Sequence, residues 1–582
     1  MARRILVLGA SLAAGVFASA AVPYDNRSAA LVGLWEAVRT FKTDVEGTLL
    51  LVERQGRLVA DIAGFVVPVL VRDDSYSFEL PDRKGTFRGR RQEKTGEIHG
   101  FWMQPPTATS STLYSSNVTL SKDGAGWRGE LRPFVDRFSY YLPITPAADD
   151  TLATYLRNPE RNDGVFAPVK SVTLEGDKVR LGGTRRGTKE PATLFEARWA
   201  DGLIVDFPGR GGSYEFRKVD ADTANAFYPR GYPPAVYRYE KPLQRDDDWK
   251  TASVEDVGID RAAIEALVRK IIETPMTSLG SSQIHSVLIA RHGKLVVEEY
   301  FHGHHRDRPH EMRSASKSLV SMLVGAAMQA GVDVAADTPV YATMLGTVPP
   351  NLEPRKRAMK LEHLLTMSGG HFCDDGNDDA PGNENTMQEQ DKERDWYRFI
   401  LALPMDRAPG EKIIYCSIDA HLAGGVLSKV AREPLPEMFD RMIARPMRFG
   451  PYHLFLTPTG EWYTGGGGHF LTRDFLKIAQ LMVNDGTWEG RRILSRDWAR
   501  KSTAALRDLG DHKYGYLWHS VEYPYRDRKV RAFFAAGNGG QISMGIPELD
   551  LVIAFTGGNY AEAALFIPQR VIVPEQILPA VK

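Results

Sequence analysis

Ser314 and Lys317 stand three positions apart at the start of an apolar run that reaches Met328. Residues at i and i+3 share one face of a helix, so the amine can reach the hydroxyl. A serine hydroxyl becomes a nucleophile at neutral pH when a nearby base takes its proton. A desolvated lysine with a lowered pKa can be that base. The free N–H groups of a helix N-terminus also suit a developing oxyanion. The pair therefore indicates acyl transfer, although a capping serine and a solvated lysine would give the same letters.

Three further motifs favour the catalytic interpretation, because they follow Ser314 along the chain in a fixed order. Each combines polar residues with apolar, helix-like or strand-like flanks. They are the segment Leu361 to Gly370, the segment Pro409 to Ser417 that contains Tyr415, and the turn Gly537-Asn538-Gly539-Gly540-Gln541.

This order of motifs resembles the serine β-lactamase and penicillin-binding-protein superfamily, and most closely class C β-lactamases, family VIII esterases and nylon-oligomer hydrolases. The resemblance covers about residues 240–582. It implies an α+β fold, an α/β/α sandwich around an antiparallel sheet. It also implies that Ser314 forms an acyl-enzyme while Lys317 and Tyr415 share the role of base. A lysine ammonium favours the phenolate form of a neighbouring tyrosine, which can then take the serine proton.

Two motifs depart from the pattern of the family. Ser417 stands where lactamases usually carry asparagine, and we expect it to orient Lys317 or the substrate. The last motif has neither the lysine nor the threonine of a Lys-Thr-Gly strand, which argues against an efficient β-lactamase. The oxyanion is expected between the Ser314 N–H and a backbone N–H at Gly540-Gln541. The candidate oxyanion and substrate-binding residues are Ser417, Asn538, Gly539, Gly540 and Gln541.

Three functions follow from these residues. The first is a serine hydrolase that cleaves a small-molecule ester or amide without a cofactor. The second is a β-lactamase or D-Ala-D-Ala peptidase, against which the missing lysine weighs. The third is a binding protein on a degenerate hydrolase fold, which the presence of the serine, lysine and tyrosine disfavours.

The composition and the N-terminal sequence limit the possible partners and the cellular location of the protein. Lys+Arg and Asp+Glu both number 73, and no basic block suggests a nucleic-acid partner. Residues 1–20 combine Arg3-Arg4, an apolar run and Ala18-Ser19-Ala20, the pattern of a secretory signal peptide. The run is too short to span a bilayer comfortably, so we expect cleavage, no stable membrane span and a periplasmic or secreted protein.

The chain is long enough for at least two domains. Apolar runs alternate with turn signals about every ten residues across 28–235, which predicts an all-β barrel or sandwich of unknown role. Residues 236–252, rich in proline and aspartate, are predicted to be a linker. The β-lactamase-like domain is expected at 253–582, with a helix from Asp260 to about Ile272 and strands at 286–290 and 294–300. A C-terminal helix is expected from Glu562 to Leu578.

The two cysteines and the histidines raise separate questions. An oxidising compartment would allow Cys373 and Cys416 to form a disulfide next to Tyr415, and two buried thiols are the alternative. The histidines at 302, 304, 305 and 310 are expected to form a surface turn, and no metal site is predicted. The loop from Cys373 to Gln390, rich in acidic residues such as Asp375, either borders the cleft and selects a cationic or polar substrate or is simply solvated.

Overall fold

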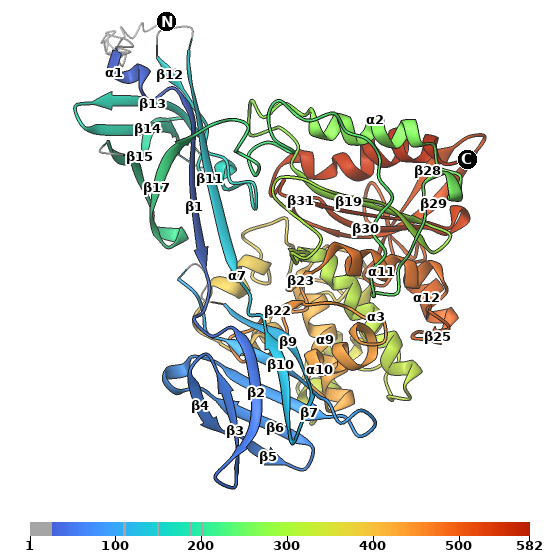
Figure 1. Cartoon of the computed structure of the whole chain (residues 1–582). Helices are drawn as coiled ribbons and strands as arrows, with labels where there is room; N and C mark the ends of the chain where they lie inside the picture. Colours follow the sequence, from blue (N-terminus) through green and yellow to red (C-terminus); the bar gives the residue numbers. More distant parts are fainter. Residues whose placement is uncertain (1–25, 109–111, 148–150, 186–187, 200–201) are drawn as a thin grey trace, which may run out of the picture.

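The computed structural model describes residues 26–108, 112–147, 151–185, 188–199 and 202–582. The predicted signal peptide at 1–20 lies outside these residues. The described chain forms a β-barrel, a large twisted sheet and a C-terminal unit in which helices cover a second sheet (Figure 1). The fold class expected from the sequence, α+β behind a mostly-β region, is confirmed.

The first part is a closed antiparallel barrel, which we call the barrel unit. Strands β1 and β11 pair along nine residues from Gly33↔Ile144 to Phe41↔Asp136. Aromatic and aliphatic side chains from all sides fill its interior. The strands are β1 (Gly33–Phe41), β11 (Asp136–Pro146), β12 (Leu152–Ala153), β13 (Val169–Glu175), β14 (Lys178–Thr184), β15 (Pro191–Trp199), β16 (Leu203–Phe207) and β17 (Gly212–Val219).

The second part, the inserted sheet, is formed by the chain between β1 and β11. It continues into the C-terminal unit, because β9 pairs with β22, β22 with β23 and β23 with β21. Ser116 Oγ and His453 Nδ1 lie 2.8 Å apart across the β9–β22 junction. The strands are β2 (Gly47–Arg54), β3 (Arg57–Ile62), β4 (Phe65–Pro68), β5 (Leu70–Arg72), β6 (Ser75–Glu79), β7 (Thr86–Arg91), β8 (Ile98–Gln104), β9 (Leu113–Asp123), β10 (Gly126–Leu131), β21 (His310–Glu311), β22 (His453–Leu456) and β23 (Gly468–Phe470).

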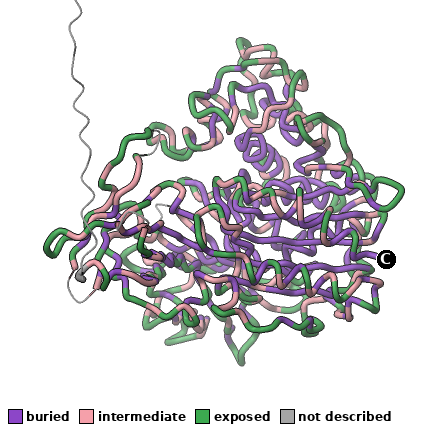
Figure 2. Tube along the Cα trace, turned by 90° about the horizontal axis from the view of Figure 1, so that it is seen from above, coloured by how far each residue is buried: buried purple, intermediate pink, exposed green. Residues whose placement is uncertain are grey.

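The C-terminal unit is built on a nine-stranded sheet in the order β18-β20-β19-β31-β30-β29-β28-β27-β26. Its central strands are buried along their whole length, and Figure 2 shows the buried chain concentrated in the part of the molecule that holds the C-terminus. The strands are β18 (Lys250–Thr251), β19 (Ile284–Arg291), β20 (Lys294–Tyr300), β26 (Arg507–Asp508), β27 (Lys513–Tyr514), β28 (His519–Tyr525), β29 (Arg528–Gly537), β30 (Gln541–Ile546) and β31 (Leu551–Gly557).

Helices cover both faces of this sheet. Helix α2 and the C-terminal helical segment share one hydrophobic core with the sheet, and α3, α9 and α11 share the other. The helices are α2 (Arg261–Ile272), α3 (Lys317–Gln329), α4 (Val340–Leu345), α5 (Pro354–Ala358), α6 (Leu361–Leu365), α7 (Glu384–Glu389), α8 (Trp396–Ala402), α9 (Ser417–Ala431), α10 (Leu435–Phe439), α11 (Thr472–Val483) and α12 (Arg496–Ser502). No helix among the described residues is long and apolar enough to cross a bilayer.

Local expectations for this unit are largely met. Asp260 caps α2 by accepting a hydrogen bond from the Ala263 N–H at 3.0 Å. The strands around His292 form the β19–β20 hairpin. The C-terminal segment differs from the regular helix expected, because it is a wide π-type helix over Pro568–Ile577 between two 3₁₀ turns. Proline has no N–H to donate, so Pro568 and Pro574 interrupt the α-helical ladder.

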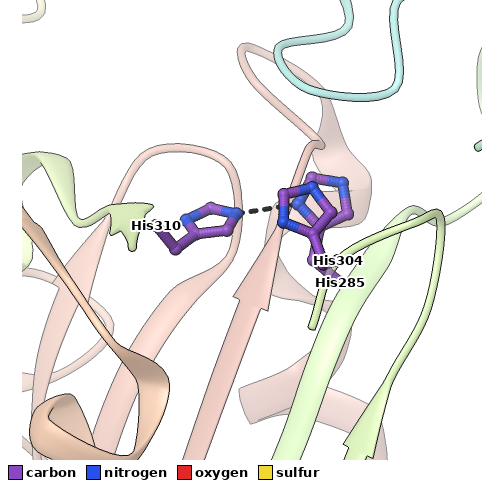
Figure 3. A group of neighbouring side chains, drawn as sticks. All are labelled: His285, His304 and His310. Atoms are coloured by element: carbon purple, nitrogen blue, oxygen red, sulfur yellow. Dashed lines mark hydrogen bonds between the residues drawn. The ribbon is translucent and has the colours of Figure 1, made fainter. Parts of the chain in front are cut away.

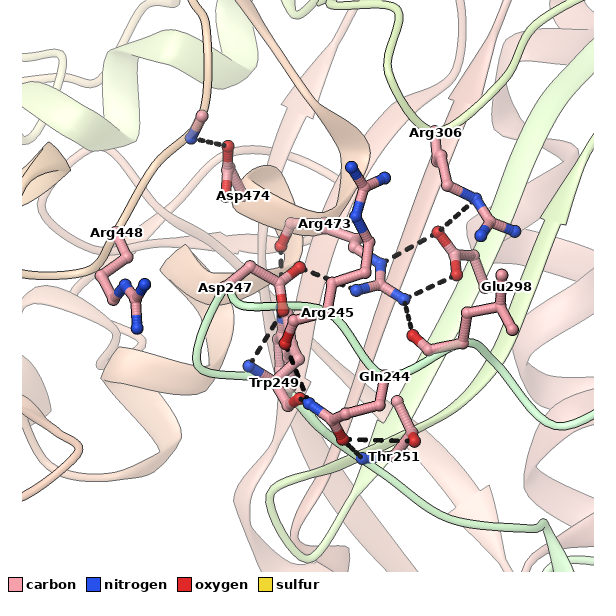
Figure 4. A network of polar contacts seen from close by, with 12 residues as sticks. Gln244, Arg245, Asp247, Trp249, Thr251, Glu298, Arg306, Arg448, Arg473 and Asp474 are labelled. Atoms are coloured by element: carbon pink, nitrogen blue, oxygen red, sulfur yellow. Dashed lines mark hydrogen bonds and ion pairs between the residues drawn. The ribbon is translucent and has the colours of Figure 1, made fainter. Parts of the chain in front are cut away.

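The predicted linker, residues 236–252, is bound to the C-terminal unit by hydrogen bonds and ion pairs. The buried Arg473 of α11 donates to Glu298 Oε2 at 2.8 Å, to Asp247 Oδ2 at 2.7 Å and to the Leu243 carbonyl (Figure 4). The indole N–H of Trp249 donates a hydrogen bond to the Arg473 carbonyl. The proline- and aspartate-rich segment is therefore held by charge pairing and by one buried tryptophan.

Candidate active site

Ser314 lies on a tight turn that packs closely against the end of β29. Ser314 belongs to the 3₁₀ turn Arg313–Ser316, and α3 begins at Lys317, so the hydroxyl precedes the helix instead of lying within its first turn. Arg313 has a φ of +48°, an unusual backbone conformation for a residue with a side chain. Strain of this kind is typical of functional turns.

Glycine makes the close packing at this turn possible. A Cβ atom at Gly537, the last residue of β29, would lie 2.1 Å from the Met312 carbonyl oxygen and 3.1 Å from the Ala315 nitrogen. The end of β29 therefore touches the backbone of the nucleophile turn directly. This contact brings the turn at 538–540 to the same site.

Lys317 and Ser314 are in hydrogen-bond contact. The Lys317 Nζ donates to Ser314 Oγ at 2.8 Å, and the lysine is 1% exposed while the serine is partly accessible. Burial alone would lower the pKa of Lys317, but Tyr415, Glu384 and Asp375 together raise it above its usual range. The expected direction, a lowered pKa, is therefore wrong. Lys317 is therefore a cation at neutral pH, and it donates a hydrogen bond to the serine oxygen.

Tyr415 faces this pair from the other side. Its ring centroid lies 5.1 Å from Lys317 Nζ. The ring packs edge-on against Tyr514 at 6.5 Å and lies nearly parallel to His519 at 6.3 Å. The structure thus brings together Ser314, Lys317 and Tyr415, from the turn before α3 and the segment before α9.

Asp375 is a site residue that the motifs did not single out. Its Oδ2 accepts from both the N–H and the hydroxyl of Ser417, at 2.7 Å and 2.6 Å. The Asp375 N–H donates to the Tyr415 carbonyl. Burial raises the pKa of Asp375 to about 6, and the charge of Lys317 partly opposes that rise. Asp375 therefore places a weakly held negative charge near Lys317, and the only signal in the sequence was its place in an acidic loop.

The observed partners of Ser417 differ from the expected ones. Its hydroxyl donates to Asp375 and not to Lys317, and its side chain is buried at the first turn of α9. Because the N–H and the hydroxyl of Ser417 both donate to one carboxylate, the residue anchors the acidic loop to α9. A disulfide joins Cys373 to Cys416 beside it, with Cα atoms 6.0 Å apart.

The turn after β29 also differs from expectation in its side chains. Gln541 is buried and bonds to the Gly557 N–H and carbonyl and to the Asn538 carbonyl. Asn538 Oδ1 accepts from the Ala561 N–H. These amides hold β31 and the following segment in place. Gly539 and Gly540, with φ of +101° and +96°, supply the turn conformation.

In the backbone of this turn, the N–H groups of Asn538 and Gly539 have no backbone acceptor among the described residues. The Gly540 N–H, expected to bind the oxyanion, already donates to the Gly537 carbonyl at 3.3 Å, and Gln541 lies in the strand pairing with Gly537. Within the described residues, the N–H groups of Ser314 and Asn538 have no backbone acceptor. Two free N–H groups, one on each side of the Gly537 contact, are the arrangement that an oxyanion requires.

Residues 268–561, just over half of the chain, match the beta-lactamase family model. The chain belongs to the beta-lactamase family.

The chain is similar to one curated hydrolase in sequence and to several solved structures in fold. A 6-aminohexanoate-dimer hydrolase of Paenarthrobacter ureafaciens is 24% identical over 242 residues, which are 38% of this chain and 59% of the relative. A family VIII carboxylesterase structure is 16% identical and covers 55% of this chain and 96% of its own, with a TM-score of 0.42. A penicillin-binding protein homologue from Caulobacter crescentus is 16% identical, with 51% and 91% coverage and a TM-score of 0.40.

Proposed function

We propose that this member of the beta-lactamase family is an exported serine hydrolase that cleaves a small-molecule ester or amide through an acyl-enzyme on Ser314. The observation that carries the proposal is the 2.8 Å contact between Lys317 Nζ and Ser314 Oγ, with Tyr415 beside it. Hydrolase relatives support the class of reaction. Export rests on the N-terminal sequence pattern.

Lys317 and Tyr415 divide the work of proton transfer. Because the Lys317 ammonium donates to Ser314 Oγ, it cannot also accept the serine proton, and Tyr415 is the acceptor in this proposal. The serine oxygen then bonds to the substrate carbonyl carbon. Tyr415 returns the proton to the leaving oxygen or nitrogen as that bond breaks. A water molecule releases the acyl group by the same path, again with Tyr415 as the base.

Two backbone N–H groups stabilise the charge that develops on the carbonyl oxygen. The Ser314 N–H is one, and the Asn538 N–H is the other in this proposal. One such donor contributes roughly 3 kcal/mol to the stabilisation of the transition state. Because the donors belong to the backbone, the side chains of Asn538 and Gln541 remain free to hold the turn.

The substrate is a small ester or amide in this proposal, and not a penicillin. Lactamases of this family use a Lys-Thr-Gly strand to hold the substrate carboxylate, and the corresponding segment here reads Asn538-Gly539-Gly540. The curated relative is named for a linear amide, the 6-aminohexanoate dimer. The anionic Asp375 near Lys317 fits a polar or cationic substrate better than an anionic one.

Covalent labelling tests the proposal. The purified protein and Ser314→Ala are incubated with a fluorophosphonate and weighed intact. A single adduct on the wild type that the variant lacks is expected, because only an activated serine reacts. A folded wild-type protein without an adduct would overturn the proposal. Turnover of p-nitrophenyl esters, 6-aminohexanoate dimer and nitrocefin then separates esterase, amidase and lactamase activity.

A further inference from the structure

Three histidines from separate segments lie together beside the active-site turn (Figure 3). His285 is on β19, His304 is in the loop after β20, and His310 is on β21, four residues before Ser314. One ring nitrogen from each lies within 4.8 Å of the other two. The sequence predicted a surface turn at 302–310, but His310 is 5% exposed and His285 is fully buried. The expectation is therefore wrong for His302 and His310, which are buried, whereas His305 is exposed as expected.

The carbonyl groups around the cluster determine which ring nitrogens carry protons. His285 Nε2 lies 2.9 Å from the Pro159 carbonyl, and His310 Nδ1 lies 2.8 Å from the Glu311 carbonyl. A carbonyl only accepts hydrogen bonds, so each of these nitrogens must carry the proton. In the neutral rings, His285 Nδ1 and His310 Nε2 then have bare lone pairs, and these two atoms lie 2.7 Å apart.

His304 adds a third unsatisfied nitrogen. Its Nε2 is buried and has no partner among the described residues. Its ring stacks on that of His285, with centroids 3.9 Å apart, and lies 5.1 Å from His310. His304 and His310 also line a cavity of about 490 Å³ between the barrel unit and the C-terminal unit. The cluster is therefore open on one side.

We propose that His285, His304 and His310 bind a divalent transition-metal ion of the Zn²⁺ class. Three neutral imidazoles with no thiolate suit such an ion. Zinc–nitrogen bonds of about 2.0–2.1 Å place two ligand nitrogens roughly 3.3 Å apart, so His285 and His310 need to separate by only about half an ångström. His304 must turn out of its stack on His285, and the cavity beside it provides the room.

The surroundings of the ligands agree with this assignment. Metal-binding histidines commonly donate their second N–H to a carbonyl or carboxylate, which orients the ring, and the Pro159 and Glu311 carbonyls do this here. Burial lowers the pKa of His310 to about 4 and also lowers that of His285 and His304. Neutral imidazole is the form of histidine that binds a metal ion.

A proton shared between His285 and His310 is the competing explanation. It would also fill the gap between the two lone pairs, with one positive charge. Burial and the nearby Arg308 both oppose protonation of the pair. A proton would leave His304 Nε2 unsatisfied, whereas a metal ion engages all three nitrogens. If a proton is shared, the protein binds no stoichiometric metal, so metal analysis distinguishes the two explanations.

The ion would act as a structural clamp on the nucleophile turn. His310 lies in β21, and β21 leads directly into the turn that carries Ser314. His285 is tied through Pro159 to the segment that follows the barrel strand β12. One ion would join the central sheet, the loop at 302–309 and β21. His304 and His310 line the cavity, from which a water molecule would reach the bound ion.

Metal analysis of the full chain without a polyhistidine tag tests this proposal. The chelator-treated protein is titrated with Zn²⁺, and bound metal is measured by elemental analysis after gel filtration. We expect one ion per chain for the wild type and at least a 100-fold weaker affinity for His304→Ala. His305→Ala, which removes an exposed histidine from the same loop, is the matched control and should bind like the wild type.

Cobalt provides a measurement that does not depend on the folding of a variant. Co²⁺ bound by the wild type should give the visible absorption of a four- or five-coordinate imidazole site, and Zn²⁺ should displace it. Zn²⁺ should also raise the Tm of the wild type and of His305→Ala but not that of His304→Ala. A wild type that binds no stoichiometric metal, or a His304→Ala variant that binds as tightly as the wild type, would overturn the proposal.

Discussion

Two buried clusters of charge in the C-terminal unit differ in how their charges are matched. Around Arg473, the guanidinium bonds to two carboxylates and one carbonyl, and the pKa of Arg473 is raised because Glu298 and Asp247 outweigh its burial (Figure 4). Around Lys317, no carboxylate of the described residues lies within 4 Å of the ammonium. Its direct partner is the Ser314 hydroxyl.

This difference separates a cluster built for stability from one built for chemistry. Matched charges in the Arg473 cluster satisfy each other, so removing one leaves its partners buried and unpaired. The Lys317 cluster instead holds a cation against a neutral hydroxyl and a carboxylate whose pKa is about 6. Such incompletely matched groups can exchange protons near neutral pH, which is typical of catalytic sites. Mutations should therefore affect stability in one cluster and rate in the other.

The largest effect is expected for Lys317→Met. The variant loses the cation that donates to Ser314 and favours the Tyr415 phenolate, so kcat/KM for a p-nitrophenyl ester should fall about 10³- to 10⁴-fold. Its Tm should stay within a few degrees, because the apolar side chain needs no buried partner. Ester hydrolysis and thermal unfolding measure the two quantities. Activity within tenfold of the wild type would remove Lys317 from the chemistry.

Arg473→Met should show the opposite pattern. It leaves Glu298 and Asp247 without their main partner, so the free energy of unfolding should fall by about 4 kcal/mol. The kcat of the folded fraction should not change. Adding Glu298→Gln should restore part of the stability, because it removes one of the unpaired charges. Urea unfolding of the single and double variants checks this, and a kcat loss at unchanged stability would contradict the contrast.

The sequence predicts the proximity of Ser314, Lys317 and Tyr415 better than it predicts their surroundings. Ser314 and Lys317 are neighbours through local spacing, and Tyr415 follows from an ordered family motif. The pKa of Lys317 is raised and not lowered as expected, because Tyr415, Glu384 and Asp375, all distant in the sequence, outweigh the effect of its burial. Long-range electrostatics of this kind depend on the tertiary fold and leave no local pattern.

The topology of the β-rich region, residues 28–235, could also be predicted only in part from the sequence. Most of its strands follow from alternation and turn signals, but β1 and β11 do not. Strand β11 is buried at nearly every position of its first half, so it lacks the alternation of a half-exposed strand. These two strands bound the insertion of β2–β10 into the barrel unit. Without them, the sequence predicts one β domain where the structure has two connected parts.

Tyr415→Phe tests whether the proton acceptor belongs to the Lys317 cluster. Loss of the hydroxyl should lower kcat about 100-fold, equivalent to roughly 2.7 kcal/mol, with no change in Tm. Tyr514→Phe, which removes a hydroxyl from the ring packed edge-on against Tyr415, is the matched control and should keep full activity. Equal losses in both variants would indicate a packing effect and would argue against Tyr415 as the base.

Asp375→Asn gives the smallest but most discriminating effect. The folded-state pKa of Asp375, about 6, lies above the ordinary value of 3.8, so the folded protein binds a proton between about pH 6 and 4 that the unfolded chain does not. Ionisation of Asp375 therefore weakens the folded state as pH rises through this window. The asparagine keeps an oxygen that accepts from Ser417 but carries no charge. The variant should be more stable than the wild type by about 2 kcal/mol at pH 8, and by almost nothing below pH 4.

The same variant should lose activity while it gains stability, because Lys317 loses one of the negative charges that raise its pKa. Urea unfolding at pH 4, 6 and 8, together with kcat at pH 8, measures both effects. If Asp375→Asn were instead less stable than the wild type at pH 8, Asp375 would behave like a matched carboxylate such as Glu298. The Lys317 cluster would then resemble the Arg473 cluster in its matched charges. The proposed division between a cluster for stability and a cluster for chemistry would be contradicted.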